Sequence, residues 1–350
     1  MKALVYTGPG KIEIVERPKP TLQAPTDAVV RLLHASICGT DLHIILGDVP
    51  TAQPGLVLGH EGVGVVEEVG SAVHNFEVGQ RVVISCMTSC GACKRCRQGI
   101  PAHCQTGGWV LGHQIDGTHA EYVRVPHATL SLHALPDLID PRAAVALSDA
   151  LPTGLEVGVL SANVQPGGSV VIIGAGPVGI AALLTAKLYT PALVVMVDRD
   201  EARLTTAQEL GAETVQTDGE GEVARERLLS LTEGQGFDSV IEAVGIPKTF
   251  ALAQELVGIG GRIANVGVHG KQAALHLDRL WDRNISIHMS LVNATTTGKL
   301  LTLPTSGVEL VTIDTDLLDS FLIRPLSPVS CVSLLLSPLW SVFGVFAGWT

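Results

Sequence analysis

The sequence predicts a two-domain α/β protein, in which a β-rich domain precedes a doubly wound parallel sheet. The chain has 350 residues, more than one ordinary hydrophobic core accommodates. Short Val-rich stretches broken by Gly and Pro fill its first part, whereas apolar strands alternate with helical stretches from residue 155 onward. We therefore expect one domain at residues 1–154, a second at 155–295, and a separate C-terminal segment at 296–350.

The first domain is predicted from strand-like stretches. Residues 28–33, 62–69 and 80–85 are rich in Val, Ile and Leu, and turn residues separate them. Such spacing is typical of a compact β domain.

The second domain is predicted from alternation of strands and helices. Strands are expected at 169–173, 193–197, 214–216, 237–243, 262–266 and 285–289. Helices are expected at 177–188, 201–210, 223–231 and 247–257. This order indicates βαβ units and hence a parallel sheet.

Four cysteines form the most specific pattern in the chain. Cys90, Cys93, Cys96 and Cys104 have the spacing C-x2-C-x2-C-x7-C. Tetrahedral zinc with four thiolates needs short loops of this kind, and a site with four protein ligands leaves no position for substrate. We therefore expect a structural zinc lobe at 86–106. Disulfides or free buried thiols are the alternatives.

A glycine motif links the first strand of the second domain to its first helix. It is the G-x-G-x-x-G formed by Gly174, Ala175, Gly176, Pro177, Val178 and Gly179. Asp198 ends the following strand, where a carboxylate accepts hydrogen bonds from the adenosine ribose, so NAD is favoured over NADP. The neighbouring Arg199 tempers that preference, because a guanidinium can bind a phosphate. The alternative is that the glycines serve only strand–helix packing.

A second metal site is predicted from three other segments. Cys38, His60 and Asp149 supply a thiolate, an imidazole and a carboxylate. Three protein ligands leave a fourth zinc position for water or substrate, which catalysis requires.

At this point the chain resembles the zinc-dependent medium-chain alcohol dehydrogenases. Residues 59–70 have the family's zinc signature G-H-E-x2-G-x5-G, and the segment C-G-T-D-x-H, the cysteine lobe and the nucleotide motif follow the family's order. The similarity covers residues 1 to about 300. It implies a GroES-like catalytic domain followed by a Rossmann domain that binds NAD.

The resemblance also implies roles for individual residues. Cys38, His60 and Asp149 would hold the catalytic zinc, and Glu61 would be an adjacent or exchangeable ligand. Thr40 would take the substrate proton and pass it through the ribose to His43, while hydride moves to the nicotinamide. The remaining implied positions are Thr153, Val244 and Gly267 at the cofactor and Trp109 at the substrate pocket.

Each of these positions has a simpler alternative. Asp149 could be a helix cap or a surface carboxylate, and Glu61 could form an ion pair behind the metal ligands. Thr40 and His43 could be ordinary polar residues of a turn and a helix start. Trp109 could fill the core.

Composition indicates the class of partner. The formal net charge of −11 argues against nucleic acid and against an anionic membrane surface. Six of the seven cysteines lie between positions 38 and 104, which suits metal binding in a reducing, cytoplasmic compartment. The N-terminus reads directly into a strand without a signal-peptide pattern. We expect small-molecule partners, and by resemblance a homodimer or homotetramer.

The expected activity is NAD-dependent oxidation of small primary or secondary alcohols and reduction of the matching aldehydes or ketones, with two zinc ions per chain. One alternative is a polyol or formaldehyde-adduct dehydrogenase of the same superfamily. Another is a catalytically impaired protein that binds zinc and nucleotide.

The end of the chain departs from the family pattern after about Thr302. Residues 325–350 carry no charged side chain and include three prolines. An altered reading frame or unspliced gene end is one interpretation; a membrane tail anchor and a divergent packing segment are the others.

Overall fold

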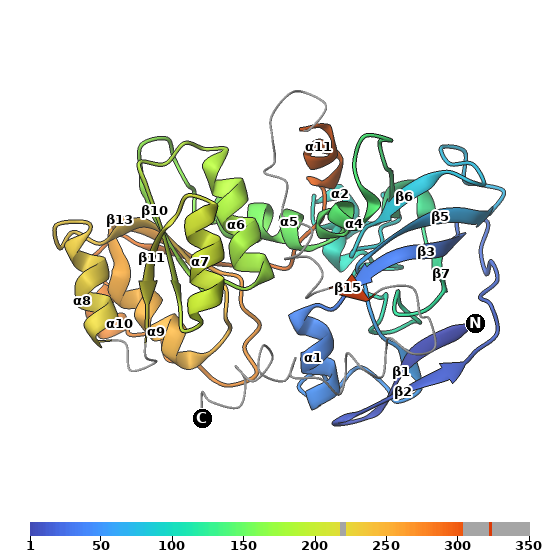
Figure 1. The fold of residues 1–350 in the computed structure, drawn as a ribbon, viewed down its shortest axis with the longest axis horizontal. Coiled ribbons are helices and arrows are strands. Elements are labelled where there is room, and N and C mark those ends of the chain that lie inside the picture. The colour runs from blue at the N-terminus through green and yellow to red at the C-terminus, as the bar shows by residue number, and fades with distance from the viewer. Residues whose placement is uncertain (218–221, 304–321, 324–350) are drawn as a thin grey trace. The chain divides into compact units, whose positions relative to one another are not determined.

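The computed structural model describes residues 1–217, 222–303 and 322–323 (Figure 1). The chain divides into two compact units, the first holding Met1–Asp149 and the second beginning at Ala150.

The first unit is built from antiparallel strands. A three-stranded sheet has the order β2 (Lys11–Glu16), β1 (Lys2–Gly8), β4 (Leu56–Val57). A second sheet has the order β15 (Leu322–Ile323), β3 (Ala28–Ser36), β5 (Gly62–Val69), β6 (Arg81–Ile84), β8 (Leu132–Ala134), and β7 (Tyr122–Val125) also pairs with β3. The strands expected at 28–33, 62–69 and 80–85 are β3, β5 and β6.

The core of the first unit lies on one face of this second sheet. Val30, Leu32, Val66 and Ile84 are all buried within one hydrophobic cluster. Because successive side chains of a strand point to opposite faces, Val30 and Leu32 of β3 share the side that faces this cluster.

Short helices connect the strands of the first unit. They are α1 (Gly39–Leu46), α2 (Lys94–Arg97), α3 (Ala128–Ser131) and α4 (Pro141–Ala144), with 3₁₀ turns η1 (Pro101–His103) and η2 (Val145–Leu147).

The second unit contains a six-stranded parallel sheet. Its strands are β9 (Ser169–Ile173), β10 (Leu193–Asp198), β11 (Glu213–Gln216), β12 (Phe237–Glu242), β13 (Val257–Asn265) and β14 (Ser286–Met289), in the spatial order β11-β10-β9-β12-β13-β14. Strands are added outward from β9 to β11 on one side and from β12 to β14 on the other, so the order of the strands reverses between β9 and β12. In open α/β sheets, such a switch point at the carboxyl ends of the strands is where nucleotides bind.

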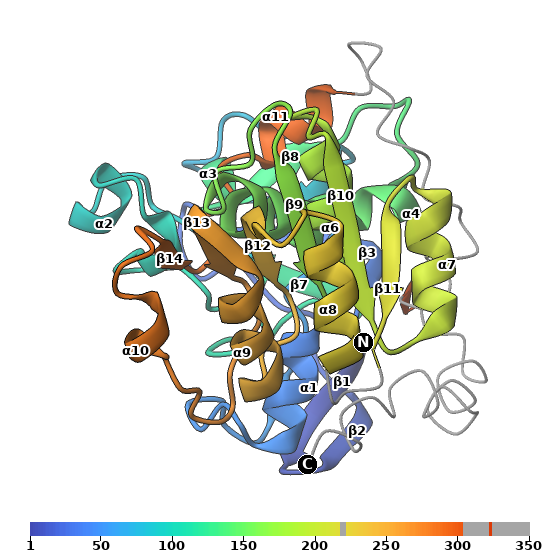
Figure 2. The same cartoon turned by 90° about the vertical axis from the view of Figure 1, so that its left-hand side faces the viewer.

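Helices cover both faces of the parallel sheet. The described helices of this unit are α5 (Ala150–Thr153), α6 (Pro177–Lys187), α7 (Glu201–Glu209), α8 (Glu222–Ser230), α9 (Pro247–Leu256), α10 (Leu277–Leu280), α11 (Thr297–Thr302) and the π-helix η3 (Gly154–Leu160). In Figure 1 the sheet lies between α6–α7 and α8–α9, and in Figure 2 α8 and α9 lie in front of the strands. The predicted α/β architecture, with a parallel doubly wound sheet, is therefore confirmed.

Strand β13 differs from the expectation at its start. It begins at Val257 directly after α9, whereas the sequence suggested residue 262. Gly236 lies so close to Gly258 that a Cβ at Gly236 would be 2.8 Å from the Gly258 nitrogen. Glycine serves close approach of two backbones here and does not end the strand.

Among the residues that the structure describes, one helical run is long and apolar enough to cross a membrane by length and composition. It covers Pro141–Leu160, and 67% of its most apolar window is buried inside the protein, as in a core helix. The interpretations as an altered reading frame and as a membrane tail anchor concern residues 325–350. That segment lies outside the described residues.

Candidate functional site

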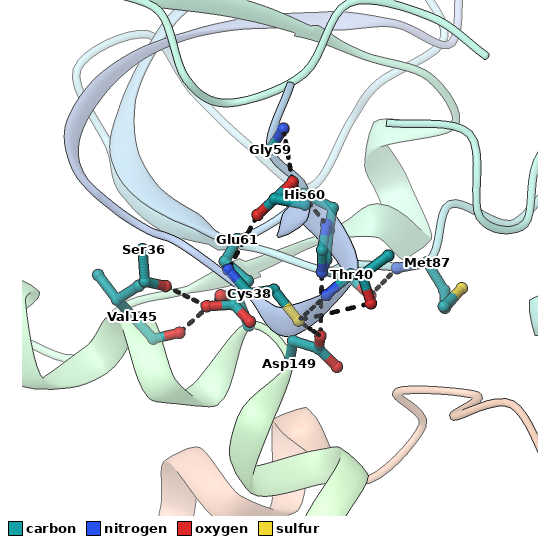
Figure 3. Close-up of polar contacts among 12 residues, drawn as sticks. Ser36, Cys38, Thr40, Gly59, His60, Glu61, Met87, Val145 and Asp149 are labelled. Carbon is teal, nitrogen blue, oxygen red and sulfur yellow. Dashed lines mark hydrogen bonds and ion pairs between the residues drawn. The ribbon is translucent and has the colours of Figure 1, made fainter. Parts of the chain in front are cut away.

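Four potential metal ligands meet inside the first unit (Figure 3). One donor atom each from Cys38, His60, Glu61 and Asp149 lies within 4.8 Å of all the others. His60 Nε2 is 3.1 Å from Asp149 Oδ2, and Cys38 Sγ is 3.9 Å from that same oxygen. His60, Glu61 and Asp149 are buried. Residues separated by up to 111 positions therefore form one compact donor cluster.

Cys38 is held by the start of helix α1. It is the N-cap residue, and its sulfur accepts a hydrogen bond from the Thr40 N–H at 3.5 Å. The Asp41 side chain accepts in return from the Cys38 N–H at 2.9 Å, which completes a capping box. This reciprocal pair fixes the thiol at the helix N-terminus, where the helix dipole favours a thiolate.

Asp41 also fixes the segment that carries His60. Its Oδ1 accepts from the Gly59 N–H at 3.2 Å and lies 3.8 Å from His60 Nδ1. Asp41 is only 1% exposed, so its charge acts at low local dielectric. The sequence interpretation gave Asp41 no role. The sequence feature that could have indicated a role for Asp41 is its place in the C-G-T-D-x-H segment, three residues after Cys38.

Glycine is required at position 59 by crowding. Gly59 has φ of 96°, and a Cβ there would lie 2.4 Å from the ring of His119. The His119 side chain is itself fixed, because Nε2 donates to the Ser36 carbonyl at 3.0 Å. Ser36 Oγ in turn donates to Glu61 Oε2, which orients that carboxylate within the donor cluster.

Burial makes negative charge costly in the donor cluster. It raises the pKa of Cys38 to about 11, and burial together with the Asp149 carboxylate raises the pKa of Glu61 to about 8. For His60, burial alone would lower the pKa, but Cys38 and Asp149 outweigh it and hold the pKa well above its usual range. A divalent cation would offset the three acidic groups.

The donors fit zinc in kind and spacing. Thiolate, imidazole and carboxylate are the ligands that zinc takes in catalytic sites, at about 2.0–2.3 Å from the ion. Two such ligands at a tetrahedral angle are about 3.5 Å apart. The contacts of 3.1 and 3.9 Å at Asp149 bracket that value.

Thr40 and His43 lie one helical turn apart on α1, beside the donor cluster. Thr40 Oγ1 is 3.6 Å from Cys38 Sγ. Residues three positions apart share a helix face, so His43 lies on the same side of α1 as Thr40. His43 Nδ1 is 2.9 Å from Asp48 Oδ2, a contact that the sequence interpretation missed.

The four lobe cysteines form a second donor cluster. Their sulfurs lie 3.5 Å apart for Cys93–Cys96, 3.9 Å for Cys93–Cys104 and 4.0 Å for Cys90–Cys96. Tetrahedral zinc with sulfurs at about 2.3 Å gives edges of about 3.8 Å. All four thiols are free in this lobe, and these separations are longer than the about 2.05 Å of a disulfide bond.

Backbone N–H groups stabilise negative charge in the lobe. The Cys104 sulfur accepts from the Cys90 N–H at 3.3 Å, and the Cys90 sulfur accepts from the Cys93 N–H at 3.4 Å. Backbone donors lower the pKa of Cys93 to about 6, whereas burial raises the pKa of Cys96 to about 12. Antiparallel bonds between Thr88 and Gly108 close the lobe at its base.

The glycine motif has the geometry that its spacing predicts. Gly174 has φ of 104°, and a Cβ there would lie 2.7 Å from Val244 Cγ2. A Cβ at Gly179 would lie 1.8 Å from the Gly174 oxygen, so only glycine permits the close turn. Gly176 caps α6 and has open space around it, while Pro177 is the first residue of that helix. The helix N-terminus is thus accessible to an anionic group.

Asp198 bridges the end of β10 and the glycine turn. Its Oδ2 accepts from the Ala175 N–H at 2.7 Å, and its Oδ1 accepts from the Arg199 and Asp200 N–H groups at 2.7 and 2.9 Å. The carboxylate is held at the carboxyl edge of the sheet.

Val244 and Gly267 meet through a buried carboxylate that the sequence interpretation missed. Glu242 Oε1 accepts from the Val244 N–H at 3.0 Å and the Gly245 N–H at 2.9 Å. A Cβ at Gly267 would lie 2.7 Å from Glu242 Oε2 and 2.1 Å from the Gly245 nitrogen. Glycine at 267 is therefore required by packing. Thr153 ends α5, next to the π-helix η3.

Trp109 takes part in the packing of the first unit. Its ring stacks on His113 with centroids 4.0 Å apart, and it packs against the cluster that contains Tyr6, Ile44 and Leu58. These contacts agree with a core role for part of the ring.

Two family models match the chain. The alcohol dehydrogenase GroES-like domain matches residues 24–137, and the zinc-binding dehydrogenase model matches residues 177–304. Together they span both structural units.

Individual relatives agree with these matches. The zinc-type alcohol dehydrogenase B of Aspergillus flavus is 36% identical over 297 residues, which are 83% of this chain and 68% of that protein. The NADP-dependent isopropanol dehydrogenase of Thermoanaerobacter brockii is 33% identical over 282 residues, 80% of this chain and 79% of that protein.

A solved structure extends the likeness to three dimensions. Zinc-dependent alcohol dehydrogenase 2 of Streptococcus pneumoniae, in its apo form, superimposes with a TM-score of 0.84 at 51% identity, over 87% of each chain. The sequence matches, the two donor clusters and the doubly wound sheet all indicate the same protein family. The chain therefore belongs to the zinc-dependent alcohol dehydrogenase family of medium-chain dehydrogenase/reductase oxidoreductases, whose members act on small molecules.

Proposed function

We propose that this oxidoreductase is an NAD-dependent alcohol dehydrogenase that interconverts small primary or secondary alcohols with aldehydes or ketones. The observation that carries the proposal is the Cys38, His60 and Asp149 donor cluster with the Thr40 hydroxyl beside it. Three protein ligands leave a coordination position for a substrate oxygen.

The chemistry divides between the metal and the chain. Cys38, His60 and Asp149 would hold a zinc ion, whose Lewis acidity would ease loss of the proton from a substrate hydroxyl. The Thr40 hydroxyl accepts that proton in the proposed relay and passes one on towards His43. A bound nicotinamide would supply the hydride acceptor, so that a C–H bond of the alcohol would break as a new C–H bond formed on the cofactor.

Glu61 is proposed as the adjacent or exchangeable ligand. Its hydrogen bond from Ser36 Oγ holds Oε2, and its position next to His60 keeps it inside the donor cluster. The same contact also suits the alternative, a carboxylate that only balances charge behind the ligands.

We propose NAD as the preferred cofactor because Asp198 stands where a ribose 2′-phosphate would bring negative charge. Two observations count in the other direction: Arg199 directly follows Asp198, and one relative is named as NADP-dependent. The proposed preference for NAD therefore rests on the Asp198 carboxylate alone. Gly174, Gly176, Pro177, Val178 and Gly179 would hold the pyrophosphate at the start of α6. Thr153, Val244 and Gly267 would lie at the nicotinamide end.

We propose that the lobe formed by Cys90, Cys93, Cys96 and Cys104 holds a second, structural zinc. Four thiolates complete the tetrahedron, so no position remains for substrate. Metal binding would replace the hydrophobic core that a lobe of short loops lacks.

Metal analysis, NADH binding and a panel of alcohols test the proposed function. Two zinc ions per chain, NADH binding and turnover of simple alcohols support it. Turnover of polyols or formaldehyde adducts alone would move the assignment to the alternative dehydrogenase. NADH binding without any turnover would support the catalytically impaired protein, and less than one zinc per chain would refute the metal sites.

We also propose that the chain forms a homodimer or homotetramer, as its family resemblance implies. Strand β14 forms one edge of the parallel sheet, and Met289 on that strand is 73% exposed. Trp281 nearby in sequence is 78% exposed. An exposed edge strand with large apolar side chains favours association with a second chain. Light scattering after size exclusion would contradict this proposal if it gave the monomer mass.

A further inference from the structure

Helix α1 ends in a motif that brings residue 48 onto residue 43. Gly47 follows the helix with φ of 87°, and its N–H donates to the Ile44 carbonyl at 3.0 Å. The Asp48 N–H donates to the His43 carbonyl at 2.9 Å. These two bonds are the Schellman arrangement that ends many helices at a glycine. The position of Asp48 relative to His43 is thus set by backbone geometry.

The side chains of the same two residues are also in contact. His43 Nδ1 lies 2.9 Å from Asp48 Oδ2. An ionised carboxylate has no proton to give, so the imidazole must donate and its proton must lie on Nδ1. The His43 side chain is 12% exposed and that of Asp48 is 40% exposed, so the contact lies between the helix and solvent.

Helix electrostatics alone would not favour aspartate at position 48. The carbonyl end of a helix carries partial negative charge, and acidic groups are unfavourable there. Asp48 follows the C-terminal end of α1, where the contact with His43 offsets this cost. The pair therefore has a local electrostatic reason to form.

We propose that Asp48 is a positioning residue, which holds His43 in the tautomer with the proton on Nδ1 and so makes Nε2 the ring atom that accepts protons. The inference rests on the proposed function, because it gives His43 the second place in the proton relay. Which ring nitrogen of a histidine carries the proton is set by the hydrogen bond that the other atom makes. Asp48 itself touches neither substrate nor cofactor in this proposal.

A purely structural role for the pair makes different predictions. If Asp48 served only to stabilise the end of α1, its loss would lower the stability of the helix and would leave the His43 tautomer and the proton transfer unchanged. The tautomer is thus the readout that separates the two roles, and it can be measured without turnover.

The first experiment measures that tautomer in the zinc-loaded full chain. Nitrogen-15 NMR of histidine side chains distinguishes Nδ1–H from Nε2–H, and His43→Gln identifies the signal of His43. We expect Nδ1–H in the wild type, retention of Nδ1–H in Asp48→Asn, whose amide oxygen still accepts, and a shift towards Nε2–H in Asp48→Ala. An Asp48→Ala spectrum with the wild-type tautomer overturns the proposal.

The second experiment measures turnover with a saturating simple alcohol. We expect Asp48→Ala to lower kcat roughly tenfold to a hundredfold, at or below the roughly hundredfold to ten-thousandfold contribution of a positioned base, and Asp48→Asn to recover much of that loss. Small exogenous bases such as imidazole should restore Asp48→Ala. Asp137→Asn, which removes the negative charge from a surface contact with Arg81 of 2.6 Å, is the control and should turn over like the wild type.

The outcomes separate this proposal from the proposed function. If His43→Gln turns over normally, the relay through His43 fails, and Asp48 loses its catalytic purpose even where the tautomer shifts. If His43→Gln is impaired while Asp48→Ala turns over normally, the relay stands and the positioning role of Asp48 is refuted. Both proposals are supported if turnover is lowered in His43→Gln and in Asp48→Ala, the tautomer shifts in Asp48→Ala, and Asp48→Asn recovers turnover.

Discussion

The Asp41 carboxylate accepts a hydrogen bond from the Gly59 backbone N–H at 3.2 Å and thereby ties the start of helix α1 to the segment before His60. Its other oxygen accepts from the Cys38 N–H at 2.9 Å. One buried side chain thus sets the separation of two donor-bearing segments. Groups that orient metal ligands commonly contribute tenfold to a hundredfold to metal affinity.

Asp41→Ala should therefore weaken zinc at the Cys38 site about tenfold to a hundredfold and leave lobe zinc in place. Removing the carboxylate leaves the Gly59 and Cys38 N–H groups without this acceptor. Metal analysis after dialysis against a graded chelator measures the effect, with Asp137→Asn as control. Equal loss of zinc from both sites would point to general unfolding and contradict the positioning role.

Cys38→Ala should abolish alcohol turnover while one zinc per chain remains. Cys38 belongs to the buried donor cluster, whereas the four lobe cysteines form a separate one. Cys93→Ala is the complementary variant, since it should lose the lobe zinc and lower the melting temperature. Metal content and turnover are measured together on both variants. Retention of two zinc ions by Cys38→Ala would contradict its role as a ligand.

Asp198→Ala should reduce the preference for NAD over NADP by at least roughly tenfold in kcat/KM, because the carboxylate that repels a 2′-phosphate is gone. Absolute activity with NAD should also fall, since Asp198 Oδ2 accepts from the Ala175 N–H at 2.7 Å in the glycine turn. Asp198→Asn keeps an acceptor for that bond and separates the two effects. An unchanged cofactor ratio in both variants would exclude the ribose role.

Acid should destabilise the protein partly through His133 on strand β8. Burial lowers the pKa of His133 below its usual value of 6.5, and its Nε2 is buried with no hydrogen-bond partner among the residues that the structure describes. The unfolded chain then binds a proton that the folded chain excludes. Stability is complete above about pH 6.5 and falls as pH drops towards the folded pKa, by about 1.4 kcal/mol per unit of pKa difference.

His133→Gln should remove this part of the acid sensitivity. Urea unfolding at pH 7.5 and pH 5.5 measures it, as the difference between the two free energies of unfolding. The variant should lose less stability between the two pH values than the wild type does. The same loss in both proteins would show that His133 does not contribute.

The short motifs were predictable because backbone geometry fixes them within one segment. The lobe cysteines lie within fifteen residues, and the glycine motif needs only a strand, a tight turn and a helix. Periodicity gave the strands and helices of the second unit to within a few residues. The predicted start of β13 at residue 262 was wrong, because Gly258 serves a close approach to Gly236 that the sequence does not reveal.

Sequence by itself determined the α/β class and the family, and it predicted the residue types for two proposed metal sites and a proposed nucleotide site, since each depends on local spacing. Only the tertiary structure decided that Asp149 lies 3.1 Å from His60, that Asp41 holds both donor segments, and that Glu242 is buried between two loops. These contacts join segments that meet only when the sheets form. Burial then sets their electrostatics, which no spacing along the chain encodes.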